Sequence, residues 1–182
     1  MNSPTNWEFF KQDQDKIIWV HICTEDLDGI AISINNWWKR RYPDYKIRVV
    51  SKNEFEQISI KPGFMKHNGG VLFRTISETE YEFKSTINEN HLNAAGITHG
   101  GYLSALIDAG AGTSAHRAAN GAPCVTISLD LKFIGASKVG DEITGLTKIL
   151  KKTNTLIFLF CELKCNDKII TSGSGVWKIL KK

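Results

Sequence analysis

The feature that most constrains the fold of this chain is one long helix followed by four strand-like segments. Residues 98–120 form the predicted helix, and the pair Asn120-Gly121 with Pro123 just beyond gives the helix a clear end. In the first segment after it, residues 124–135, apolar side chains alternate with polar ones, which is the pattern of a strand with one buried face. The body of the chain is therefore expected to combine a single helix with a sheet.

The other strand-like segments make that sheet antiparallel. Two of them, residues 71–78 and 81–88, precede the helix, and short polar turns at 152–154 and 166–168 join the last three as hairpins. A single helix can cover only one face of six strands, so the sheet is expected to curl around it. This is the layout of the α+β hotdog fold, in which a six-stranded antiparallel sheet wraps one long central helix.

Residues 1–52 form a separate segment in front of the predicted hotdog domain at residues 53–182. Residues 16–23 and 45–51 are predicted strands, and residues 27–43 between them place apolar side chains on one face of a helix. That face is too apolar to stay in water, so we expect it to dock on the main body or on a partner. No residue in this N-terminal extension indicates a chemistry.

Composition and charge argue against several classes of function. The 182 residues carry a formal net charge of only +4 and show no basic stripe with interleaved aromatics, so nucleic acid is not an expected partner. No apolar run reaches the roughly 18–20 residues that span a bilayer, and the N-terminus lacks a secretory layout, so a cytoplasmic protein without membrane contact is expected. A mild positive charge would suit an anionic small ligand such as a coenzyme A ester, and it would equally suit many other partners.

The four cysteines fit the same compartment. Cys161 and Cys165 lie on one face of a predicted strand, whereas Cys23 and Cys124 are remote and no histidine cluster completes a zinc site. We therefore predict structural or buried thiols rather than a metal site.

The triplet His99-Gly100-Gly101 opens the helix. The first N–H groups of a helix lack internal partners and carry partial positive charge, so they can bind an anion or stabilise a developing one. Because glycine has no Cβ, Gly100 and Gly101 would let a substrate carbonyl approach these N–H groups closely. The alternative is that the glycines allow tight packing of the helix on the sheet.

Asp108 is the one acid in an otherwise small and apolar part of the helix. A central helix wrapped by a sheet would bury much of this surface, and a partly desolvated carboxylate is a better base. We therefore expect Asp108 to be partly buried, either as a base or as an acid that accepts hydrogen bonds from a neighbouring loop.

The length of the helix separates these two features. Nine residues at about 1.5 Å rise put His99 and Asp108 roughly 13–14 Å apart along the axis, too far for one substrate atom to touch both. If both serve one site, a second copy of the chain must supply one of them, as two antiparallel helices side by side would do. The spacing predicts a homodimer with two composite sites.

Three further polar residues are candidates for the same site. Asn93, in the loop before the helix, could orient a water through its amide, or it could simply close a turn. His99 could steady that turn or touch the substrate. Ser128, grouped with Thr126 and Asp130 on the polar face of its strand, could assist the acid on the helix or face solvent.

The stretch HLNAAGITHGGYLSALIDAGAG, residues 91–112, resembles the signature of the PaaI-type hotdog acyl-CoA thioesterases. The resemblance runs from about Pro62 to the C-terminus and includes the break after the helix and the turn at Gly140-Asp141. It implies hydrolysis of a small or medium acyl-CoA or aryl-acyl-CoA by a homodimer or a dimer of dimers, that is, a homotetramer. It also implies that no metal ion and no redox cofactor take part.

The same resemblance implies a role for each candidate residue. Asp108 would be the general base or the nucleophile, and Asn93 would orient the lytic water or the leaving group. Gly101 would polarise the thioester carbonyl through its backbone N–H, with His99 beside it. Ser128 would assist from the subunit that carries the acid.

Two other functions are alternatives. A hotdog enoyl-CoA hydratase or dehydratase would act on the acyl chain, and a non-catalytic acyl-CoA-binding protein would keep the pocket without using a base. An acid opposite a helix N-terminus that suits a carbonyl favours the hydrolase over the hydratase. The presence of Asp108 also argues against a binding protein, although the extra N-terminal segment keeps that alternative open.

Overall fold

The computed structural model describes residues 7–12, 17–22, 39–41, 43–44, 46–51 and 54–180 of the chain. The chain divides into two compact units, Met1–Glu54 and Phe55–Lys182, and each is described by itself.

The first unit contains a three-stranded sheet. Its strands are β1 (Trp7–Gln12), β2 (Ile17–Ile22) and β3 (Lys46–Ser51), in the order β1-β2-β3. β2 pairs with β1 antiparallel and with β3 parallel. The two strands predicted from the sequence are thus present, and β1 is an additional one. The predicted helix at 27–43 lies mostly outside the described residues, although 39–41 are helical.

The second unit is built on a seven-stranded antiparallel sheet in the order β4-β5-β6-β8-β9-β10-β7. The strands are β4 (Glu56–Ile58), β5 (Val71–Thr75), β6 (Glu80–Thr86), β7 (Cys124–Phe133), β8 (Glu142–Lys152), β9 (Leu156–Cys165) and β10 (Lys168–Ile179). The helices are α2 (Phe64–His67), the 3₁₀ turn η1 (Glu89–His91) and α3 (Gly100–Ala118). The predicted hotdog layout is confirmed, with one strand more than expected because β4 is too short to show a period in the sequence.

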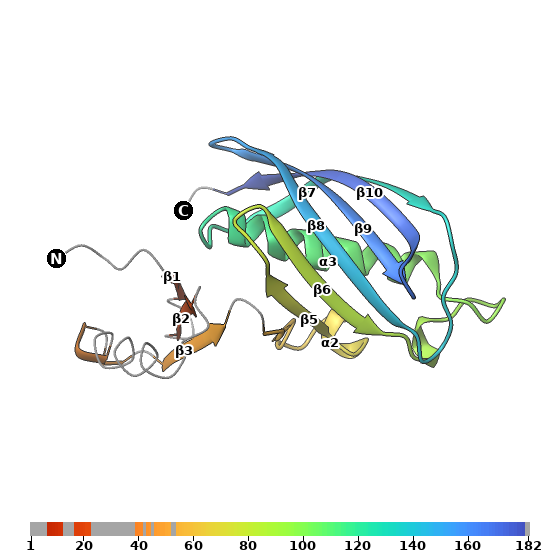
Figure 1. Ribbon diagram of the computed structural model, residues 1–182, viewed down its shortest axis with the longest axis horizontal. Helices are drawn as coiled ribbons and strands as arrows, with labels where there is room; N and C mark the ends of the chain where they lie inside the picture. The colour runs from red at the N-terminus through yellow and green to blue at the C-terminus, as the bar shows by residue number, and fades with distance from the viewer. Residues whose placement is uncertain are drawn as a thin grey trace. The chain divides into compact units, whose positions relative to one another are not determined.

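The long helix α3 runs across one face of this sheet (Figure 1). It buries the side that carries Leu103, Leu106, Ile107 and Ala111, which pack against inward-facing strand residues such as Phe83. Its other side is not covered by the sheet, because a single sheet reaches only one side of a helix. That open side carries most of the candidate site.

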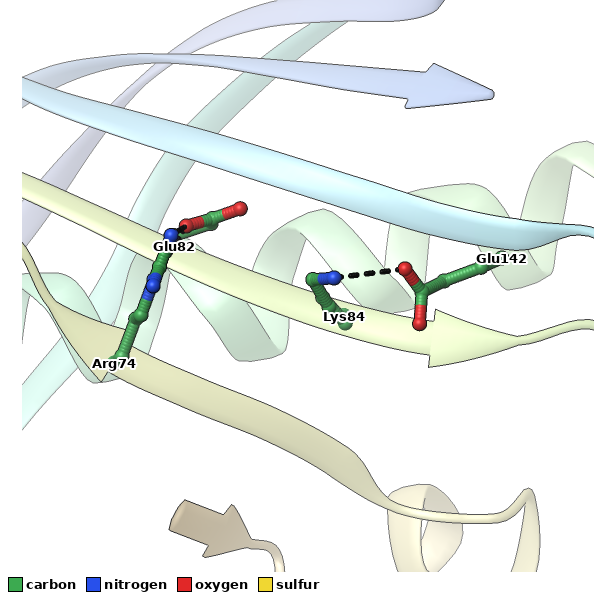
Figure 2. A network of polar contacts seen from close by, with 4 residues as sticks. All are labelled: Arg74, Glu82, Lys84 and Glu142. Atoms are coloured by element: carbon green, nitrogen blue, oxygen red, sulfur yellow. Dashed lines mark hydrogen bonds and ion pairs between the residues drawn. The ribbon is translucent and has the colours of Figure 1, made fainter. Parts of the chain in front are cut away.

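The opposite face of the sheet carries ion pairs on β5, β6 and β8, beside the partly exposed side chains of Leu72 and Leu146. Arg74 pairs with Glu82, and Lys84 Nζ lies 2.8 Å from a carboxylate oxygen of Glu142, so the pairs cross from strand to strand (Figure 2). The Arg74–Glu82 pair is partly buried, whereas Lys84–Glu142 is exposed, and an exposed pair typically stabilises a fold by at most about 1 kcal/mol. These pairs join neighbouring strands and indicate no chemistry on this face.

Strand β7 ends the sheet and leaves an unusually open edge. It pairs with β10 on one side, and its Ile127 and Phe133 are 56% and 54% exposed. The pairing shifts between Val176 and Trp177 of β10, which places a β-bulge at Ile127. Beyond this bulge the strand presents the opposite face to the helix, a shift that matters for the site.

Candidate active site

The start of α3 leaves one backbone donor free. His99 is the N-cap residue, and its Nδ1 accepts a hydrogen bond from the N–H of Gly101 at 2.8 Å. The N–H groups of Tyr102 and Leu103 donate to the carbonyl of His99. No acceptor for the N–H of Gly100 lies among the described residues. The unsatisfied N–H at this helix end is therefore that of Gly100, which favours Gly100 over the predicted Gly101 as a donor to a substrate.

The two glycines have different reasons to be glycine. A Cβ on Gly101 would lie 2.8 Å from Nδ1 of His99, so a side chain there would displace the cap. A Cβ on Gly100 would meet only the Phe133 ring at 3.4 Å, which is ordinary contact. Gly101 thus permits the cap, and Gly100 keeps a backbone donor accessible.

The loop before the helix is closed by Asn93. Its side-chain oxygen accepts hydrogen bonds from the N–H of Ala95 at 2.9 Å and from the N–H of Ile97 at 3.4 Å. The side-chain NH₂ of Asn93 has no partner among the described residues. One end of the amide therefore shapes the loop, and the other can donate to a ligand.

His91 ties this loop to the rest of the fold. The side chain is 1% exposed, its Nδ1 accepts from the N–H of Asn88 at 3.1 Å, and its Nε2 lies 3.0 Å from the carbonyl of Asn68. Since a carbonyl can only accept, Nε2 carries the proton and the ring is neutral. The ring stacks on Tyr102 with centroids 3.6 Å apart, and the backbone carbonyl of His91 accepts from His99. His91 therefore fixes both ends of the loop that precedes α3.

Asp108 lies on the open side of α3. The hydroxyl of Thr126 on β7 donates to its Oδ1 at 2.6 Å. The carboxylate is exposed in the single chain, so the expectation of partial burial is wrong for the isolated chain. The physical reason is that the sheet covers the other side of α3.

The strand residue beside the Asp108 carboxylate is Thr126 and not the predicted Ser128. Thr126 pairs with Trp177, whose side chain is buried on the helix side of the sheet, whereas Ser128 pairs with Val176, which faces the other way. The bulge at Ile127 separates two residues that simple alternation would place together. Ser128 is exposed. The sequence offered no sign of the bulge, so Thr126 was missed as a partner of Asp108.

Two hollows flank this arrangement. An open groove of about 650 Å³ begins at Asp108 and Thr126 and continues along α3. A second hollow of about 560 Å³ lies next to Ile97 of the Asn93 loop, and Lys138 and Lys168 line it. The groove is lined by Asp108 itself, whereas the second hollow is lined by Ile97, a neighbour in sequence of the candidate residues Asn93 and His99.

Within one chain the free donor and the acid do not meet. Gly100 and Asp108 are eight residues apart on one helix, which is about 12 Å along its axis. The structure therefore brings Asp108 together with Thr126. Asn93 lies in the loop that leads to His99 and Gly100. Within one chain, the pair of Asp108 and Thr126 stays apart from the residues at the start of α3.

Comparison with known proteins identifies the family. A model described as the thioesterase superfamily matches residues 95–170. The Pseudomonas aeruginosa protein PA0474, which is named for an esterase activity, is 35% identical over 94 residues, or 51% of this chain and 70% of that protein. Acyl-coenzyme A thioesterase 13 of Mus musculus is 28% identical over 114 residues, or 62% of this chain and 81% of that protein.

The chain belongs to the thioesterase superfamily. Solved structures agree with this. Thioesterase superfamily member 2 of zebra fish has a TM-score of 0.61 at 25% identity, covering 67% of this chain and 90% of that one. E. coli PaaI has a TM-score of 0.59 at 18% identity, covering 64% and 83%. A hypothetical thioesterase of Streptococcus pneumoniae, solved with coenzyme A, has a TM-score of 0.60 at 16% identity, covering 65% and 92%.

The family match and the relatives named for esterase and acyl-CoA thioesterase activity identify the chain as a thioester hydrolase. The expected resemblance to PaaI-type proteins is confirmed at the level of the fold. The matched residues 95–170 include Gly100, Asp108 and Thr126, while Asn93 precedes them. Within the described parts of the chain, no helix is both long enough and apolar enough to cross a membrane.

The buried ring of His91 predicts that the fold loses stability in acid. Burial lowers the pKa of His91 from its ordinary value of 6.5, and the hydrogen bond to Asn68 opposes this shift. Between the folded and the unfolded pKa, the unfolded chain binds a proton on His91 that the folded chain does not bind. The contribution of His91 to stability is therefore complete above about pH 6.5 and is lost as the pH falls toward the folded pKa. NMR titration of the His91 ring should give a midpoint below 6.5.

The variant His91→Phe separates the ring's stacking from its hydrogen bonds. It can still stack on Tyr102 but leaves Asn88 N–H and Asn68 C=O unpaired, and it should lower the free energy of unfolding at pH 7 by about 1–3 kcal/mol. Urea unfolding across pH 5–8 should also show a weaker acid dependence than in the parent. An unchanged acid dependence in His91→Phe would assign that dependence to other groups.

Proposed function

We propose that this thioesterase hydrolyses a small or medium acyl-CoA or aryl-acyl-CoA to the free acid and CoA, in composite sites formed by two copies of the chain. The observation that carries the proposal is the carboxylate of Asp108, held by Thr126 at the mouth of a groove on the open side of α3. The names of the relatives, among them acyl-coenzyme A thioesterase 13, support a CoA ester as the substrate class. The coenzyme A in the S. pneumoniae structure supports it as well. The cytoplasmic location stays a prediction.

The carbonyl of the thioester would lie at the start of α3. There the free N–H of Gly100 and the positive end of the helix dipole would hold the carbonyl oxygen as it gains negative charge. His99 would act indirectly, because its ring already accepts from Gly101 and so fixes the backbone that presents Gly100.

Asp108 would act on the carbonyl carbon, as a general base or as a nucleophile. As a base, it takes a proton from water while the water oxygen bonds to the carbon, and the C–S bond then breaks with the proton passing to the CoA thiolate. The Thr126 hydroxyl occupies Oδ1 and leaves the other carboxylate oxygen for water. The NH₂ of Asn93 would orient that water or the departing sulfur.

A second copy of the chain would complete the site. The open side of α3 carries small residues at helical spacing, among them Gly101 and Ala105, which would let a second helix approach closely. The long exposed edge of β7 is also of the kind that proteins cover by pairing. Two antiparallel copies of α3 would bring Asp108 of one chain to Gly100 of the other and would remove the acid from bulk water. A dimer of such dimers is compatible with this arrangement.

Asp108 is the first residue to test. With a panel of acyl-CoAs and detection of free thiol, Asp108→Asn and Asp108→Ala should lower kcat by about a hundredfold or more, because both remove the positioned base or nucleophile. Unchanged turnover in both variants would refute the role of Asp108. Tight binding of an acyl-CoA without any thiol release by the parent would instead indicate a binding protein.

Two strand variants are the matched controls for this experiment. Thr126→Val removes the hydroxyl that holds Asp108 and should lower kcat about tenfold, while Thr126→Ser keeps the hydroxyl and should restore most of the rate. Ser128→Ala, on the other face of the same strand, should leave turnover unchanged. If Ser128→Ala lowers kcat and Thr126→Val does not, then Ser128 rather than Thr126 is the strand residue that assists Asp108.

The donor role of Gly100 has a test of its own. Gly100 is the first residue of α3, where proline is well tolerated, and His99 has φ −66° and ψ 132°, a conformation that suits a residue before proline. Gly100→Pro therefore deletes the N–H while keeping the helix, and should lower kcat about 10²–10³-fold. Gly100→Ala keeps the N–H and is the control for added bulk. Equal activity in the proline variant and the parent would exclude this N–H as the carbonyl donor.

A further inference from the structure

The groove that starts at Asp108 has one wall made by α3. Gly112 and His116 follow Asp108 at intervals of four residues and line the groove with it. Residues at this spacing lie on one side of a helix, so the wall extends about 12 Å from Asp108 to His116. The groove therefore leads away from the reacting carbon over a length that a small or medium acyl group could occupy.

The floor of the groove is formed where Gly112 meets Trp177. Trp177 is 1% exposed, and a Cβ on Gly112 would lie 3.4 Å from its indole nitrogen, which is ordinary contact. Cys124 and Val125 of β7 line the other side. The glycine thus leaves open a space that any larger side chain would fill, without being required by the packing of the helix. Gly110, two residues earlier, differs, because a Cβ there would lie 2.4 Å from the Phe83 ring.

His116 lines the groove about two turns of α3 beyond Asp108. Nδ1 of His116 lies 2.9 Å from the carbonyl of Ala122, so Nδ1 carries the proton and donates. Burial is the main cause that lowers the pKa of His116 below its ordinary value, and the charge of Arg117 lowers it further, while the bond to Ala122 opposes the shift. The ring is therefore neutral near pH 7.

Charge separates this groove from the second hollow. Among the described residues that line the groove, Asp108 is the only one with a full charge. The hollow beside Ile97 has Lys138 and Lys168 together with Asp141. An anionic CoA nucleotide is better matched to the hollow with two lysines, and an uncharged acyl group to the groove without them.

We propose that the groove from Asp108 to His116 is the acyl-binding site, that Gly112 determines the size of the acyl group it accepts, and that this group is uncharged. This inference rests on the proposed function and adds to it the part of the substrate that the enzyme selects. The alternative occupant of the groove is the pantetheine arm of CoA, and the experiment below distinguishes the two.

Chain-length profiles test the role of Gly112. We would measure kcat/KM for straight-chain acyl-CoAs from acetyl to decanoyl with the parent and with Gly112→Val. A side chain in the acyl site penalises long chains only, so Gly112→Val should keep its rate on the shortest substrate within about twofold. On the longest substrate that the parent accepts, it should lose about tenfold or more. Adipoyl-CoA should be a poorer substrate for the parent than hexanoyl-CoA.

The matched control is Gly63→Val. Gly63 has extended backbone and no atom within 4 Å of its Cβ position, so this substitution should leave the profile unchanged. If Gly112→Val lowers kcat/KM equally for every chain length, the pantetheine arm occupies the groove and the proposal is overturned. A chain-length profile that does not differ from that of the parent would overturn it as well. If Gly112→Val melts at a lower temperature than the parent, Gly112→Ala gives the same comparison with a smaller side chain.

Protection of Cys124 gives a readout that does not need turnover. Its thiol is partly buried in the groove and can be labelled slowly with N-ethylmaleimide and followed by mass spectrometry. The thioether S-hexyl-CoA, which cannot be hydrolysed, should slow labelling at least fivefold, and free CoA should not. Equal protection by both would overturn the proposal. A parent that releases no thiol from any acyl-CoA would refute the proposed function, while this labelling would still decide the occupant of the groove.

Discussion

The one-sided packing of α3 is the constraint on which the rest of the structure depends. A single sheet can bury only one side of a helix, and here that side carries Leu103, Leu106 and Ile107 against the inward residues of the strands. The other side is left with small residues and Asp108. The same geometry that gives the fold its core therefore leaves the acid exposed in the single chain, next to a groove and an open strand edge. These exposed features all lie where a second copy could cover them.

The start of α3 is held in place by polar contacts. The stack of His91 on Tyr102 and the cap that His99 makes with Gly101 fix the first turn from two sides. Tyr102 in turn shares a hydrogen bond of 2.6 Å with Ser85 in the sheet. Because these contacts satisfy the neighbouring groups, the N–H of Gly100 is left as the donor without a partner among the residues that the structure describes. A preorganised donor of this kind costs little to align when charge develops on a carbonyl.

The fold could be predicted from the sequence because its determinants are local. An antiparallel sheet around a helix is indicated by one capped helix and by several hairpins. One hairpin turns at Asn166-Asp167, where both φ angles are positive. The site was predicted in part. The stretch 91–112 pointed to Asn93, His99 and Asp108, whose roles stay predictions. The burial of Asp108 was expected wrongly, because it depends on what lies beyond the single chain, and Thr126 was missed because a bulge leaves no periodic signal.

The central claim is that the acid and the carbonyl donor of each site come from different chains. The most direct test mixes Asp108→Asn with Gly100→Pro protein after subunit exchange, when each is inactive alone. In a mixed dimer one site then has both defects and the other has none, so random exchange should restore about a quarter of the parent activity. Thiol release that stays at the sum of the two separate variants, with exchange shown by mass spectrometry of differently labelled subunits, would contradict the composite site.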